Sequence, residues 1–168
     1  MIWMWSATTF NLYTMNFYLK YIPGGKFVNF SMAGGAEVLA NIFIGIVFKY
    51  LQVKWSFFVG YCLAAAGGVC LIFQAQFENS DLLIATFVLL GKFGIAMAQC
   101  TCFIATPWLF PIQVNATAFG ICNLVGRLFA LAAPIVAEFE SPLPMMIFSV
   151  ACAISILLSF FIQQPKGE

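Results

Sequence analysis

The stretch LLGKFGIAMAQCTCFIATPWLFPIQVNATAFGICNLVGRLFALAAPIVAE, residues 89–138, decides the fold class. Lys92 and Arg127 are its only charged residues before Glu138 at its end. Together with the apolar residues before it, it forms two apolar segments on either side of PWLFP, and each is long enough for the roughly 20 residues that a bilayer-spanning helix requires. A helix is required because lipid offers the backbone no hydrogen-bond partner. The stretch therefore predicts two consecutive transmembrane helices.

The same composition continues through the whole chain. Of its 168 residues, 63% are hydrophobic and 8% are charged, far less charge than a soluble domain uses to cover its surface. We therefore predict an all-α, polytopic membrane protein in which residues 1–168 form one bundle of six transmembrane helices. The predicted spans are 2–19, 27–48, 55–73, 82–105, 116–137 and 143–162.

Several functional classes are disfavoured by composition. The chain has no histidine, and its six cysteines all fall inside apolar runs without a second ligand pair, so we expect no metal site. A net charge of +1 gives no sign of nucleic-acid binding. We expect neither a cofactor nor an enzymatic activity.

Three ionisable residues lie well inside predicted spans: Glu37, Lys92 and Arg127. Each costs about 2.5–3.5 kcal/mol or more at the centre of a membrane helix, so each needs a partner or an aqueous cavity. One interpretation is a polar path for an ion or a charged substrate. The other is a structural pair, such as Glu37 with Lys92, together with an Arg127 side chain that reaches toward the membrane surface.

Three prolines are candidate helix breaks. Pro107 and Pro111 flank the end of the fourth span, and Pro134 lies inside the fifth. Proline removes a backbone donor and can kink or end a helix, and carriers use discontinuous helices to form binding sites. A simple helix end at Pro107 and a kink without function at Pro134 are the alternative.

Small residues recur every fourth position in two spans. Gly60, Ala64 and Gly68 do so in the third span, and Gly126 and Ala130 in the fifth. Such stripes allow helix backbones to approach closely in lipid, so they indicate a packed bundle and no particular substrate.

The residues that carry chemistry follow a family pattern. Gly91-Lys92-Phe93, then Leu109-Phe110-Pro111, then Arg127 followed by Pro134 resemble the tenth and eleventh helices of the organic cation and anion transporters, a family of the major facilitator superfamily. Ala36–Ala40 (AEVLA) is similar to the V-E-x-P-A motif of that family's eighth helix, without its proline. The resemblance covers the whole chain in helix order.

The resemblance implies the fold and the site. The chain would correspond to the C-terminal six-helix half of a twelve-helix carrier, whose substrate cavity lies between its two halves. Glu37 and Arg127 would then lie on the cavity side, with Lys92 as a third candidate. Arginine at position 127 is typical of the anion-preferring branch of the family, whereas the cation branch more often has aspartate there.

The gate motifs of the family are degenerate. The family has glutamate where Trp108 stands and arginine where Asn115 stands. Its D-x-x-G-R-R/K connector is replaced by KYLQVK, residues 49–54, which lacks the acid and the glycine. In the superfamily these charges lock the cytoplasmic gate, a two-state element on which alternating access depends.

Two hypotheses follow. The chain is half of a carrier that moves a small organic ion by alternating access when a second half joins it, or it is a transport-inactive, carrier-derived subunit of a larger membrane complex. The expected partners are the lipid bilayer and a second six-helix half, a second copy, or other subunits. The plasma membrane and the mitochondrial inner membrane are both open as the host membrane.

Overall fold

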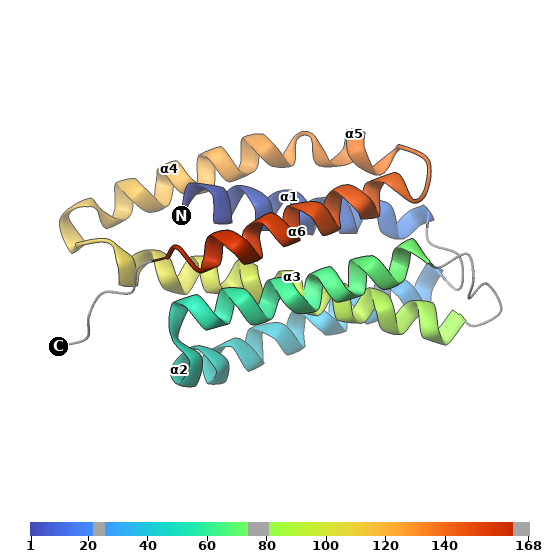
Figure 1. The fold of residues 1–168 in the computed structure, drawn as a ribbon, viewed down its shortest axis with the longest axis horizontal. Coiled ribbons are helices and arrows are strands. Elements are labelled where there is room, and N and C mark those ends of the chain that lie inside the picture. The colour runs from blue at the N-terminus through green and yellow to red at the C-terminus, as the bar shows by residue number, and fades with distance from the viewer. Residues whose placement is uncertain (22–25, 74–80, 163–168) are drawn as a thin grey trace.

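The computed structural model describes residues 1–21, 26–73 and 81–162 of the chain. The helices are α1 (Ile2–Tyr18), the short 3₁₀ turn η1 (Leu19–Tyr21), α2 (Lys26–Ile72), α3 (Asp81–Leu109), α4 (Ile112–Ala130), α5 (Ala133–Ala137) and α6 (Leu143–Ser159). Among the described residues there is no β-strand. Figure 1 shows the helices lying side by side along the long axis of one bundle.

Helix α2 is two antiparallel segments joined at Gln52, whose φ of 60° and ψ of −177° interrupt the helix. We call Phe27–Tyr50 its N-terminal arm and Gln52–Ile72 its C-terminal arm. The backbone conformation of Gln52 belongs to a region that is essentially restricted to glycine. Gln52 occupies the fourth position of KYLQVK, where the resembling family has glycine, so the sharp turn is present although the residue that favours it is absent.

Within residues 1–21, 26–73 and 81–162, four helices are long and apolar enough to cross a membrane: both arms of α2, Leu82–Leu109 and Ile112–Ala137. Helix α6 is apolar but shorter, at 17 residues, and α1 also has 17. With the arms of α2 counted separately and α4 and α5 taken together, the described residues form six rods, and Figure 1 shows consecutive rods running antiparallel. The predicted all-α membrane fold class is confirmed, and the arrangement of the described helices is consistent with half of a major facilitator fold. The limits of the predicted spans stay predictions, because a helix end does not mark the edge of a bilayer.

Helix α3 packs between α2 and α1. Glycines bring it against the C-terminal arm of α2: a Cβ atom on Gly94 would lie 2.3 Å from the backbone nitrogen of Ala64, and one on Gly67 would lie 2.3 Å from that of Gly91. Gly60 also faces α3, whereas Gly68 faces Phe148 of α6. The stripe of small residues on the C-terminal arm of α2 therefore allows two helices, α3 and α6, to pack closely against it, because a larger side chain at Gly60 or Gly68 would clash with them.

The three prolines behave differently. Pro107 does not break α3, which continues through it and ends two residues later at Leu109; of the two interpretations, the helix end close to Pro107 fits the structure better than a break. Pro111 has extended backbone angles and caps the start of α4.

Pro134 lies in the first turn of α5, a position that tolerates proline. Helix α4 ends four residues earlier, at Ala130. The proline has no N–H to donate to the carbonyl of Ala130, and its ring would clash with that carbonyl in a continuous helix. Residues 131 and 132 therefore interrupt the rod between α4 and α5.

Candidate functional site

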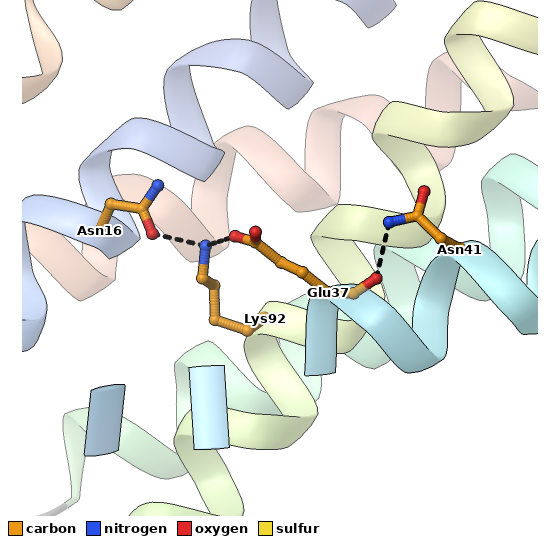
Figure 2. Close-up of polar contacts among 4 residues, drawn as sticks. All are labelled: Asn16, Glu37, Asn41 and Lys92. Carbon is orange, nitrogen blue, oxygen red and sulfur yellow. Dashed lines mark hydrogen bonds and ion pairs between the residues drawn. The ribbon is translucent and has the colours of Figure 1, made fainter. Parts of the chain in front are cut away.

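Lys92 of α3 is the centre of a polar network that joins three helices. Its side chain is 1% exposed. The ammonium Nζ donates a hydrogen bond to Asn16 Oδ1 of α1 at 2.5 Å and forms an ion pair with Glu37 Oε1 of the N-terminal arm of α2. Figure 2 shows the ammonium between these two acceptors. A buried lysine therefore has both a counter-charge and a neutral acceptor.

Glu37 differs from Lys92 in its access to the surface, since its side chain is 41% exposed. Its backbone carbonyl accepts a hydrogen bond from Asn41 Nδ2 at 2.8 Å, one helical turn later (Figure 2). Asn41 Oδ1 in turn accepts one from Cys100 Sγ of α3 at 2.9 Å. The network thus continues from the buried ammonium toward the surface.

These residues line a cavity of about 220 Å³, which we call the Glu37 cavity; its lining is Leu12, Glu37, Asn41, Ala96, Gln99, Cys100 and Phe103. The Oε1 atom of Gln99 is buried and has no hydrogen-bond partner among the described residues. A buried acceptor without a partner is uncommon and indicates an unfilled binding capacity. The cavity therefore combines one carboxylate, amide groups and an aromatic ring.

Arg127 lies in a different place. Its side chain is exposed on α4, and its Nε donates to Asn123 Oδ1 at 3.1 Å, one turn earlier. It lines a second cavity of about 290 Å³, the Arg127 cavity, with Tyr13, Phe17, Ala130, Leu131 and Pro134. Within residues 1–21, 26–73 and 81–162, no carboxylate forms an ion pair with Arg127.

The structure therefore brings two of the three predicted charges together and leaves the third apart. Glu37 and Lys92 form the pair that the structural interpretation predicts. Pro134 lines the Arg127 cavity beside the interruption between α4 and α5, whereas Pro107 and Pro111 line neither of the two cavities. In the described part of the chain, no three His, Cys, Asp or Glu side chains form a group able to hold a metal ion.

Sequence reasoning missed the amide side chains of the network. Asn16, Asn41 and Gln99 lie within or beside apolar runs, and such polar groups need hydrogen-bond partners inside a membrane. Their placement in apolar spans was the signal that could have identified them. Which helix each one faces depends on the packing of the bundle and could not be read from spacing.

No family model matches the sequence. Among curated proteins, the chain is 25% identical to solute carrier family 22 member 4 of Mus musculus, over 95% of the chain and 29% of that protein. It is 22% identical to organic cation/carnitine transporter 2 of Homo sapiens, over 99% of the chain and 30% of the relative. It is 26% identical to the organic cation transporter-like protein of Drosophila melanogaster, over 98% of the chain and 29% of the relative. The chain spans less than a third of the length of these relatives.

Proposed function

The chain is related over nearly its whole length to organic cation and carnitine transporters of the major facilitator superfamily, and on this premise we propose that it supplies one six-helix half of a carrier for a small organic ion. It is a multi-pass integral membrane protein. The relatives are named as transporters, which supports a carrier over an enzyme. Alternating access would arise from movement of this half against a second one.

The observation that carries the proposal is the placement of charge next to cavities. Glu37, which is paired with Lys92, lines the Glu37 cavity, and Arg127 lines the Arg127 cavity. Charged side chains inside membrane spans are costly and characteristically mark substrate pathways. Glu37 and Arg127 are accessible from the surface of this half, where a second half would close over them.

The two cavities support complementary roles. In the Arg127 cavity a guanidinium without a carboxylate partner among the described residues lies near Tyr13 and Phe17, which suits the carboxylate and the apolar body of an organic anion. In the Glu37 cavity a carboxylate suits an organic cation. An organic ion with both charges would use both sites, provided the second half brings them into one chamber.

Uptake into sealed vesicles tests the proposal. Vesicles from cells that produce the chain with its natural partners are given radiolabelled small cations, zwitterions and anions, and are compared with vesicles from cells that lack it. We expect uptake of at least one of these substrates above the control. Arg127→Ala should reduce the uptake of carboxylate-bearing substrates at least tenfold, whereas Arg127→Lys retains the charge and part of the activity. Unchanged uptake in Arg127→Ala contradicts the role of Arg127.

A second candidate function is a transport-inactive subunit of a larger membrane complex. The observation that favours it is that the Lys92 ammonium already has two partners within the chain. The KYLQVK turn also lacks the acid, and Trp108 replaces the glutamate, of the resembling family's gate motifs. This alternative predicts no uptake of any substrate in the panel, together with stable co-purification of a large assembly that contains no complementary carrier half.

A further inference from the structure

We propose that Lys92 is a tethered counter-ion that a cationic substrate displaces from Glu37, and that Asn16 is the acceptor that retains the lysine after displacement. This inference rests on the proposed carrier function and assigns positioning roles to Lys92 and Asn16, which act through Glu37 and do not themselves line the Glu37 cavity. It begins from the arrangement in Figure 2, where one ammonium is shared by a carboxylate and an amide from two different helices.

The two members of the ion pair have unequal access. The Lys92 side chain is 1% exposed, whereas that of Glu37 is 41% exposed and lines the cavity. A ligand that enters the cavity therefore meets the carboxylate and not the ammonium. Lys92 approaches the same carboxylate from the protein interior, so a cationic ligand and Lys92 compete for one anion.

The Asn16 amide makes this competition possible. A buried ammonium that lost its only partner would remain as an uncompensated charge, which is strongly unfavourable. Lys92 already donates to Asn16 Oδ1 at 2.5 Å, so release from Glu37 leaves it with one hydrogen bond to a neutral acceptor. Asn16 thus lowers the free-energy cost of the displaced state without competing as a charge.

The cavity lining specifies the class of ligand. Gln99 Oε1 is a buried acceptor without a partner in the described part of the chain, and it lines the same cavity as Glu37 and Phe103. A ligand with N–H donors can satisfy Gln99 and Glu37 together, and Phe103 provides an aromatic ring, a group that attracts cations, in the cavity lining. With about 220 Å³ of space, the cavity suits a small organic ammonium that retains N–H groups.

The test is equilibrium binding of radiolabelled phenethylammonium to the full chain, isolated with its natural partners and reconstituted in lipid nanodiscs. The neutral analogue 2-phenylethanol is the matched ligand control. Lys92→Met removes the competing cation, so we expect binding tighter by about tenfold or more, the size of a charge-assisted hydrogen bond. Lys92→Arg keeps the competitor and should bind close to wild type. Glu37→Gln should lose the preference for the cation over the neutral analogue.

Asn16→Leu keeps both charges of the Lys92–Glu37 pair, and its expected effect on phenethylammonium affinity is opposite to that of Lys92→Met. Without Asn16 the displaced lysine has no acceptor, so phenethylammonium should bind several-fold more weakly than to the wild type. A purely structural role for Asn16 would lower stability and leave the affinity of the folded protein unchanged. This variant also carries the test if Lys92→Met does not fold.

Two outcomes overturn the inference: unchanged or weaker binding by Lys92→Met, and unchanged binding by Asn16→Leu. Absence of specific phenethylammonium binding to both the wild type and Lys92→Met overturns it as well. The proposed carrier function is judged separately by the uptake panel, which includes anions and zwitterions. If the wild type transports one of these while Lys92→Met leaves cation affinity unchanged, only the displacement mechanism fails.

Discussion

Two basic residues, Lys92 and Arg127, lie in adjacent predicted spans of this chain, and the structure shows opposite burial and pairing for their side chains. Lys92 is buried on α3 and its ammonium is held by acceptors on two other helices. Arg127 is exposed on α4, and its only hydrogen bond among the described residues is to Asn123, one turn away on the same helix. Their sequence surroundings are similarly apolar. The position of each helix in the bundle therefore determines whether its basic side chain is buried and paired or exposed.

The difference follows from packing. Glycines allow α3 to pack against the C-terminal arm of α2. In the most apolar part of α3, 56% of the residues are buried, compared with 17% in the most apolar part of the rod formed by α4 and α5. A charge on α3 must find a partner inside the protein, since water does not reach it. A charge on α4 can face a cavity and keep some hydration. We therefore expect the partners of Lys92 to affect the stability of the fold as well as cation binding, and Arg127 to affect substrate recognition with little effect on stability.

The largest expected effect is the loss of the counter-charge of Lys92. Glu37→Leu leaves a buried ammonium with only Asn16, and should lower the free energy of unfolding by about 3–5 kcal/mol. Denaturation of the purified protein in detergent, followed by circular dichroism, measures this. The double variant Glu37→Leu/Lys92→Met removes both charges and should recover most of the loss. A double variant as unstable as the single one would show that the charge is not the cause.

The second effect concerns the helix crossing that buries Lys92. In Gly94→Ala the added Cβ atom would lie 2.3 Å from the backbone of Ala64, so the helices must separate, at a cost of about 1–3 kcal/mol. Gly120→Ala on α4 is the matched control because its Cβ atom meets nothing within 4 Å. That control should be neutral or stabilising by up to about 1 kcal/mol, since alanine favours helix. Thermal unfolding of the pair in detergent checks the contrast, and equal shifts would contradict it.

How far the sequence predicts this molecule can be judged from these same residues. Apolar runs of about 20 residues predict the membrane helices, because the bilayer imposes that length on any sequence. The pairing of Glu37 with Lys92 was one of two interpretations. A charge in a span needs a partner or an aqueous cavity, but the sequence does not show which residue the partner is. Asn16 was missed because an amide 76 residues from Lys92 reveals its role only when α1 packs beside α3. At Pro107 the sequence left a break and a simple helix end as alternatives, because proline is compatible with both; in the structure α3 ends two residues beyond it.

The third prediction concerns the turn at Gln52, which joins the two arms of α2 and so positions the N-terminal arm that carries Glu37. Gln52 adopts a backbone conformation that is essentially restricted to glycine. Gln52→Gly should therefore raise the free energy of unfolding by about 1 kcal/mol, and Gln52→Val should lower it by a similar amount or more. The Gly–Val difference in thermal midpoint measures the strain. If the two variants unfold at the same temperature, the turn adopts a different conformation.

The smallest expected change in stability is that of Arg127→Ala, and it completes the comparison between Lys92 and Arg127. Its side chain is exposed and bonds only to Asn123 in the described residues, so Arg127→Ala should change the free energy of unfolding by no more than about 0.5 kcal/mol. The same variant should remove most uptake of carboxylate-bearing substrates, because the Arg127 cavity then has no charged side chain. Asn123→Ala, which removes the local partner and keeps the guanidinium, is the matched control and should retain uptake. Thermal unfolding and vesicle uptake, measured on the same preparations, separate the effect on stability from the effect on transport. A large loss of stability in Arg127→Ala would show that Arg127, like Lys92, holds the fold together. The contrast between the two basic residues would then be wrong.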